Sequence, residues 1–247
     1  FRDCKLSIPL CYPLVELGVA LWFMTEASHL HRLFHPVSGV GSLSAEGIVT
    51  LLTTHIGVAI LGFLLIGLMV MDWQTHLLPD AFTLWGIAIG FVLTCVQAAF
   101  LGPNEDAVVL SNNHIHLTSP GAVVDTGNVF FTGPEHLVLG RITAICGAAL
   151  LLLFIRWIYK ALRHREGMGL GDVKLLAMIA AFLGFAPAIL ALFFGVVLAS
   201  AYGAILLARG KATAASKLAF GSFLAIGGLI AAQYGNRLID MYASLLR

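Results

Sequence analysis

Two acidic residues lie next to long apolar runs and are the first candidates for chemistry. Asp72 follows the apolar run 48–71, and Asp172 precedes the run 173–185. Two carboxylates held a few ångströms apart cannot both ionise easily, so they share one proton. The ionised member can take a proton from water while the protonated member donates to a carbonyl oxygen. Such a pair can hydrolyse a peptide bond, and because it titrates as a unit, neither residue is assigned as acid or base.

The surroundings of Asp172 are rich in glycine. Gly169 and Gly171 precede it within the segment 167–174. Glycine has no side chain and permits unusual backbone angles, so we expect a substrate backbone to approach closely here. A helix that starts at this point would also place its exposed N–H groups and positive dipole end beside the carboxylate. The structural alternative is that Asp172 only caps this helix.

Three further charged residues have both a functional and a structural interpretation. Asp80 begins an apolar run, and it either caps that helix or belongs to the site. Lys174 either supports the site or neutralises a neighbouring carboxylate, and Glu16 either supports the site or lies at the membrane interface. Asp72 differs from these, because it stands at a helix C-terminus, where the dipole disfavours a negative charge.

The composition of the chain indicates that these residues are surrounded by a membrane. Of 247 residues, 59% are hydrophobic and only 11% are charged, whereas a soluble domain has about 25% charged residues. The net charge of +1 argues against a nucleic-acid-binding protein. A membrane helix needs about 20 apolar residues. The candidate spans are 13–34, 48–71, 81–101, 137–158, 173–185, 187–207 and 219–234. The predicted fold class is an all-α integral membrane protein with about seven transmembrane helices.

The basic residues predict how the chain is oriented in the membrane. With a cytoplasmic N-terminus, the inside segments contain Arg2, Lys5, Arg156, Lys160, Arg163, Arg165, Lys174, Arg209, Lys211 and Lys217. The outside segments and helix ends contain only Arg32, Arg141, Arg237 and Arg247. The long loop 102–136 is acidic and falls outside, where residues 123–131 have the pattern of a short hairpin. Asp72 and Asp172 then lie on the cytoplasmic side, and ionisable residues at membrane depth favour a functional interpretation.

Two of the predicted spans have features that affect packing. The run 173–185 rises only about 20 Å at about 1.5 Å per residue, against a hydrocarbon core of about 30 Å. If this helix reaches the outer surface, Asp172 is recessed into the membrane. In the third span, Gly86 and Gly90 form a GxxxG step that would allow close approach of another helix.

The histidines and cysteines do not predict a metal site. His29, His31 and His35 cluster at the outer end of the first span, and His114 and His116 form an HxH pair in the long loop. Such sets can bind metal, but no cysteine or carboxylate completes them. The four cysteines are scattered and do not form a disulfide framework. We therefore predict no metal ligand.

Three stretches together resemble a known family. The first is Asp72-x-x-Thr75-x-x-Leu78-Pro79-Asp80-x-x-Thr83, the second is Gly169-Leu170-Gly171-Asp172-Val173-Lys174-Leu175, and the third is Tyr12-Pro13-Leu14-Val15-Glu16-Leu17. They resemble the signatures of bacterial type IV prepilin peptidases, which are intramembrane aspartyl proteases of the GxGD type. They occur in the family's order and spacing.

The resemblance implies an activity. Family members remove the basic leader of type IV prepilins and pseudopilins, just after a glycine and at the cytoplasmic face of the bacterial inner membrane. They serve type IV pili and type II secretion. Many also methylate the new N-terminus with S-adenosylmethionine. The family's catalytic aspartates correspond to Asp72 and Asp172, and no cofactor is implied for proteolysis.

The resemblance also implies a domain organisation. Residues 1–12 are interpreted as the remnant of a cytoplasmic N-terminal region, and residues 13–247 as a polytopic membrane peptidase domain with the outer loop 102–136. The family typically has eight transmembrane helices, and seven would fit a chain that lacks the first. The family usually has two CxxC pairs that resemble a zinc site. Cys4 corresponds to the last of these four cysteines, and the other three have no counterpart in this chain, so zinc is not predicted.

Two alternatives remain open from the sequence. One is a related GxGD peptidase that acts on preflagellins or Tad pilins. The other belongs to a different class, a membrane transporter whose carboxylates bind a cation or a proton. In such transporters the acidic residues lie near the midplane, whereas here both aspartates lie near one face, and the sequence has no evident inverted repeat.

Overall fold

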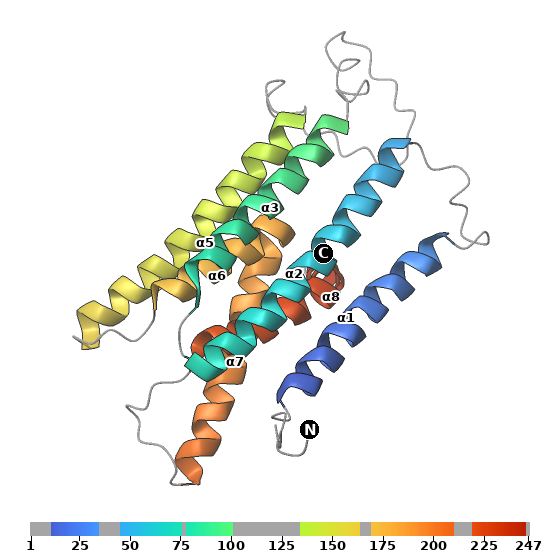
Figure 1. The fold of residues 1–247 in the computed structure, drawn as a ribbon. Coiled ribbons are helices and arrows are strands. Elements are labelled where there is room, and N and C mark those ends of the chain that lie inside the picture. Colours follow the sequence, from blue (N-terminus) through green and yellow to red (C-terminus); the bar gives the residue numbers. More distant parts are fainter. Residues whose placement is uncertain are drawn as a thin grey trace, which may run out of the picture.

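The computed structural model describes six segments of the chain, residues 11–34, 45–75, 78–100, 134–163, 169–209 and 219–245. These residues form helices and short connections, with no strand among them (Figure 1). Residues 102–133 of the outer loop with its predicted hairpin, the N-terminal residues 1–10 and His35 lie outside the described residues. The last residues of the predicted loop, 134–136, belong to a helix. The helices are α1 (Cys11–Phe34), α2 (Ala45–Thr75), α3 (Asp80–Phe100), α5 (Pro134–Arg163), α6 (Leu170–Leu183), α7 (Phe185–Ala208) and α8 (Phe220–Leu245).

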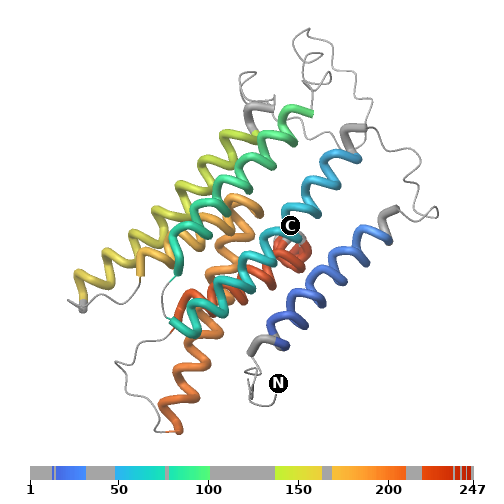
Figure 2. Tube along the Cα trace, viewed as in Figure 1, coloured from blue at the N-terminus to red at the C-terminus, as the bar shows by residue number. Residues whose placement is uncertain are grey.

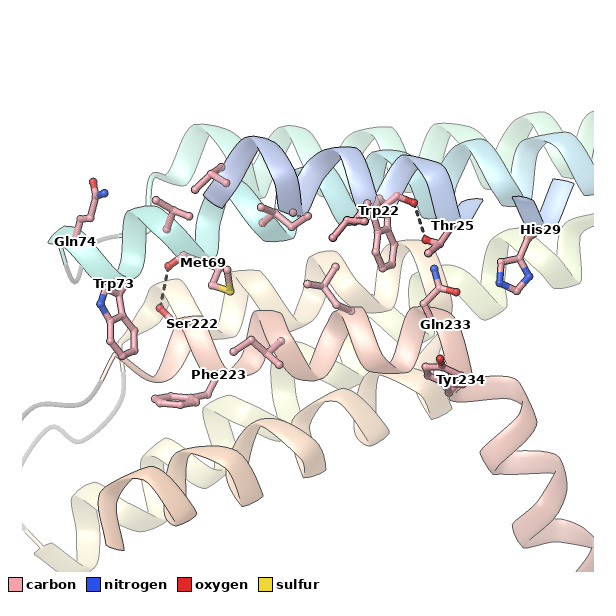
Figure 3. A pocket seen from close by; sticks show the side chains of 17 residues that line it. Trp22, Thr25, His29, Met69, Trp73, Gln74, Ser222, Phe223, Gln233 and Tyr234 are labelled. Carbon is pink, nitrogen blue, oxygen red and sulfur yellow. Dashed lines mark hydrogen bonds between the residues drawn. The ribbon is translucent and has the colours of Figure 1, made fainter. Parts of the chain in front are cut away.

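Each of the seven predicted spans corresponds to one of these helices, so the all-α membrane fold is confirmed. Four helices are long and apolar enough to cross a membrane by themselves: Ile48–Thr75, Asp80–Phe100, Leu137–Leu162 and Phe185–Ala208. The others are weaker candidates. Helix α6 has only 14 residues, and the apolar part of α8 is Phe220–Gly235. The predicted end of this last span, Tyr234, lies where α8 changes direction in Figure 3.

The bundle is built around α6, which is apolar on all sides. A helix of this kind is stable only when other helices cover every face. Helices α2, α3, α5, α7 and α8 all pack against it (Figures 1 and 2). Several of its residues are completely buried: Leu175, Leu176, Met178, Ile179, Ala180 and Ala181. The short central helix is therefore held in a fixed position, together with any residue at its N-terminal end.

Glycines bring the surrounding helices close to this centre. A side-chain carbon on Gly90 would lie 3.0 Å from the backbone of Ala181, and one on Gly86 would overlap Met178. The predicted GxxxG step therefore packs α3 against α6. A carbon on Gly227 of α8 would likewise overlap the carbonyl of Ala191 on α7. Small residues at such crossings are typical of membrane helices, where close packing replaces the hydrophobic effect.

Helix α1 lies at the edge of the bundle beside α2 (Figure 2). Its buried Glu26 ties it to two other helices. Nδ1 of His55 on α2 lies 3.3 Å from the Glu26 carboxylate, and Nε2 of Gln233 on α8 donates to it at 2.5 Å. Hydrogen bonds between polar side chains stabilise helix association inside a membrane. Trp22 lies on α1 one turn before Glu26, and its ring packs against Gly62 of α2.

Candidate active site

Asp72 lies in the last turn of α2 and is buried, with 5% of its surface exposed. The helix continues to Thr75, so Asp72 is inside it rather than just beyond its end, as the sequence suggested. The start of α8 supplies two donors to its Oδ2 atom. The Ser222 backbone N–H donates at 2.6 Å and the Ser222 hydroxyl at 3.0 Å. Because the first N–H groups of a helix have no partner within it, they are suited to hold a carboxylate.

Asp172 lies in the first turn of α6 and is also buried, with 7% exposed. The predicted helix start at 173 is wrong, and so is the structural alternative in which Asp172 stands before the helix as its cap. Helix α6 begins at Leu170, and Gly169 occupies the cap position. The Asp172 side chain turns back, and its Oδ2 accepts a hydrogen bond from the Gly169 N–H at 3.2 Å. This is the third position of the helix, from which an acidic side chain can satisfy the free N–H of the cap residue.

The two carboxylates meet at Gly221, in the first turn of α8. A side-chain carbon at this position would lie 2.9 Å from Oδ2 of Asp72 and 3.1 Å from Oδ1 of Asp172. The two oxygens are therefore no more than about 6 Å apart. The carboxylates are also close enough to repel each other. Three helix ends, those of α2, α6 and α8, thus bring two acidic groups together around a residue without a side chain.

Residues 59–204 match the type IV leader peptidase family, and this stretch includes both Asp72 and Asp172. The chain belongs to this family. It is 29% identical over 244 residues to the prepilin leader peptidase/N-methyltransferase of Pseudomonas putida, covering 98% of this chain and 64% of that protein. The Stutzerimonas stutzeri protein of the same name is 28% identical over 244 residues, covering 99% of this chain and 65% of that protein. No solved structure matches the chain.

This member of the leader peptidase family thus spans less than two thirds of the length of the curated relatives that it matches. A third relative, from Pseudomonas aeruginosa, is matched to the same extent. It is 28% identical over 240 residues, which cover 97% of this chain and 64% of that protein. Membership of the family and the apolar helices together make the chain an integral membrane protein.

The glycines before Asp172 have a different role from the one predicted. Gly169 is in an extended conformation open to any residue, with φ −76° and ψ 156°, and Gly171 is helical. The space that a Gly171 side chain would need is occupied by Leu78, whose Cβ and Cδ1 atoms would both lie 3.0 Å away. Gly171 therefore lets the α2–α3 connection pack against α6. Of these two glycines, Gly169 alone has open space at the position of a side-chain carbon, with its first neighbours 3.8 Å away.

Asp80 and Lys174 form an ion pair beside the two buried carboxylates. The Lys174 Nζ atom lies 2.6 Å from Oδ1 of Asp80. Asp80 is the first residue of α3, and its side chain is 64% exposed. Lys174 therefore neutralises the carboxylate of Asp80. This is one of the two interpretations that the sequence left open for Lys174. The pair also links the start of α3 to the start of α6.

We expect Asp80→Asn to keep most of the cleavage activity, within about fivefold of the parent. Asp80 lies inside the first turn of α3 and not at the cap position that the structural interpretation of the sequence gave it. An exposed ion pair contributes only about 0–1 kcal/mol, and an acidic group in the first turn of a helix adds about 0.3–1 kcal/mol through the helix dipole. The measurement is the initial rate of prepilin cleavage by the purified variant. A loss as complete as that of Asp72→Asn would show that Asp80 takes part in the chemistry.

Glu16 lies exposed on α1. Within the part of the chain that the structure describes, the hydrogen bonds and ion pairs around Asp72 and Asp172 do not include it. A supporting role for Glu16 therefore stays a prediction from the sequence. Among the described residues there is also no group of three or more His, Cys, Asp or Glu side chains suited to a metal ion.

Gly221 and Ser222 are the site residues that the sequence analysis missed. The sequence contained a weak signal for both residues, because a glycine and a serine stand together at the start of the last apolar run. The predicted topology places this start on the same side of the membrane as both aspartates. Ser222 is 2% exposed, and its hydroxyl oxygen also lies 3.0 Å from the Met69 carbonyl on α2, so its single proton is shared between that carbonyl and Asp72. This residue therefore fixes the start of α8 against the last turns of α2.

Proposed function

We propose that this chain is an intramembrane aspartyl endopeptidase that removes the leader of type IV prepilins or pseudopilins after a glycine. The observation that carries the proposal is the meeting of two buried carboxylates, Asp72 and Asp172, on either side of Gly221. The family match supports the class of enzyme. The relatives named prepilin leader peptidase/N-methyltransferase support the class of substrate.

The chemistry follows from the proximity of the two acids. Two like charges in a buried site repel each other, so the pair retains one proton between them. The unprotonated carboxylate removes a proton from a water molecule, which attacks the carbonyl carbon of the scissile bond. The protonated carboxylic acid donates its proton to the carbonyl oxygen. Ser222 holds Asp72 with two hydrogen bonds, and Gly169 holds Asp172 with one, so both groups are oriented before substrate binds.

The dyad is proposed to face the cytoplasm from the bacterial inner membrane. The support is the excess of Lys and Arg in the segments on the same side as Asp72 and Asp172, including Arg163, Arg209 and Lys211. A prepilin with a basic leader, still on the cytoplasmic side after synthesis, would meet the carboxylates there. Preflagellins and Tad pilins are the alternative substrates, and a comparison of the rates at which the three substrates are cleaved separates these possibilities.

Methylation is not part of the proposal. The methyl donor S-adenosylmethionine carries ribose hydroxyls and charged groups that need a polar binding surface. The groove next to Ser222 is lined mainly by apolar side chains such as Val70 and Phe223. This groove therefore does not fit the cofactor, and the names of the relatives include an N-methyltransferase activity.

The test is cleavage of a prepilin with a Gly–Phe junction by the purified protein in detergent, followed as a gel shift. We expect the leader to be released without added metal or nucleotide. The competing function is tested on the same preparation, reconstituted in liposomes, as a flux of protons or cations. Ion flux without cleavage would refute the proposed peptidase function and support a transporter instead.

A further inference from the structure

A groove of about 600 Å³ runs between α1, α2 and α8 (Figure 3). We call it the α1–α8 groove. Apolar side chains make most of its walls, with Leu21 on α1, Ile66 and Val70 on α2, and Ile226 and Leu229 on α8. Polar side chains lie at its two ends. Ser222 and Gln74 mark one end, and His29 and Gln233 mark the other (Figure 3).

The first end of the groove adjoins the candidate active site. Ser222 lines the groove and donates two hydrogen bonds to Asp72. Trp73, the residue after Asp72, lines it as well, together with Phe223. The Trp73 and Phe223 rings lie in contact, with centroids 6.3 Å apart, and form part of the wall at this end. The groove therefore ends at the residues next to Asp72 and at the serine that holds it, although the two carboxylates themselves do not line it.

The groove has the length of a short helix. Its lining on α1 extends from Val15 to His29, and on α8 from Ser222 to Tyr234. At about 1.5 Å per residue these stretches are about 20 Å long. The groove thus runs from the dyad through much of a hydrocarbon core of about 30 Å. An occupant of this length and apolar character would be embedded in the membrane, and a peptide at that depth must be helical to satisfy its own N–H and C=O groups.

One position in the α1 wall carries no side chain. A side-chain carbon on Gly18 would have no described neighbour within 4 Å, and Gly18 lines the groove about one turn from Val15. The other glycine of this region, Gly62, is covered by the Trp22 ring. At Gly18 the side chains of an occupying helix therefore have room to enter. A helix recognised in this way contacts a groove through residues spaced three and four apart.

We propose that the α1–α8 groove binds the apolar helical segment of the peptide substrate and thereby places the scissile bond between Asp72 and Asp172. The proposal rests on the function proposed above and adds where the substrate lies. The continuity of the groove with Ser222 favours this occupant over others. A lipid chain, a second copy of the chain or a further segment of a longer protein has no reason to end at the carboxylates.

The first test fills the groove. The substrate is a synthetic prepilin peptide with a basic leader, a Gly–Phe junction and an apolar segment of about 20 residues. Gly18→Phe places a ring at this position, where the added Cβ atom meets no described neighbour within 4 Å. We expect KM to rise at least about tenfold while kcat changes less than about threefold, because loss of uniform binding raises KM alone. The matched control is Gly67→Phe, on an exposed part of α2 outside the groove that is equally free of neighbours. An unchanged KM in Gly18→Phe would overturn the proposal.

The second test detects binding without cleavage. A benzoylphenylalanine is placed at position 21, within the groove, in the Asp172→Asn variant, and irradiated with the same peptide. The control position is 157, on the exposed face of α5. We expect the peptide adduct at position 21 to exceed that at 157 at least fivefold.

The two tests separate this proposal from the proposed function. A peptide adduct at position 21 supports the groove even if the parent protein cleaves nothing, which would refute only the peptidase. Cleavage by the parent with no peptide adduct at position 21 refutes the groove and leaves the peptidase in place. Adducts with lipid or with a second copy of the chain, in the presence of peptide, would also overturn the proposed occupant.

Discussion

Asp72→Asn and Asp172→Asn are each expected to lower the rate of prepilin cleavage by about 10⁴-fold or more, the loss typical of catalytic groups that act as a unit. Asparagine keeps the size of the side chain and can still accept the hydrogen bonds from Ser222 or Gly169. It cannot exchange a proton near neutral pH, so the dyad no longer activates water. The double variant is expected to be no slower than either single variant. The measurement is single-turnover cleavage by purified protein.

Conservative changes sharpen this prediction. Asp72→Glu and Asp172→Glu keep the acid but move it by roughly an ångström, and misplacement on this scale costs about a hundredfold. Asp80→Asn is the matched control, because it removes an acidic group next to the site without touching the dyad. Each variant must elute and melt like the parent in detergent. Full activity in either asparagine variant with intact folding would exclude a catalytic dyad of Asp72 and Asp172.

Gly221→Ala is expected to reduce cleavage by about a hundredfold, which is the cost of a displacement of about an ångström. The new methyl group would lie 2.9 Å from Oδ2 of Asp72, 3.1 Å from Oδ1 of Asp172 and 2.9 Å from Cδ1 of Leu78. All three contacts are shorter than an ordinary van der Waals distance, so the carboxylates must move apart or turn. Rates of the variant and the parent are compared on the same prepilin.

Stability and a second substitution identify the cause of this loss. Alanine is favoured over glycine in a helix by about 1 kcal/mol, so we do not expect a large loss of thermal stability in Gly221→Ala. Gly140→Ala on α5 is the control, because its methyl group meets no described neighbour. Leu78→Ala combined with Gly221→Ala removes only the contact with leucine. If that double variant regained full activity, the loss would come from Leu78 rather than from the carboxylates.

The sequence predicted the helices well because each is marked by its own apolar run. The ends were less accurate, since they depend on a few capping groups. Helix α6 begins three residues before the predicted start at 173 because the Asp172 side chain satisfies the N–H of Gly169. Helix α2 continues to Thr75, whose hydroxyl donates to the Met71 carbonyl within the last turn.

The partners of the two aspartates could not be predicted in the same way. Asp72 and Asp172 stood out because acidic residues are rare beside apolar runs, and the resemblance to prepilin peptidases named both. Ser222 lies 150 residues from Asp72, and a single sequence contains no signal for so distant a contact. The hydrogen bond between Glu26 and Gln233 joins residues 207 positions apart and is unpredictable for the same reason. Gly221 was overlooked because its contribution is the absence of a side chain between the two carboxylates, and this contribution is visible only in the packed structure.

The short central helix has a consequence for the route by which water enters the site. Helix α6 has 14 residues and a length of about 21 Å, some 9 Å less than the hydrocarbon core of an average bilayer. Longer helices cover it on every face, so this difference lies inside the protein and not against the lipid. When the far end of α6 reaches the opposite surface, its polar start lies below the level of the headgroups. Hydrolytic water then reaches Asp172 through the protein, between the ends of α2, α6 and α8, and not across acyl chains.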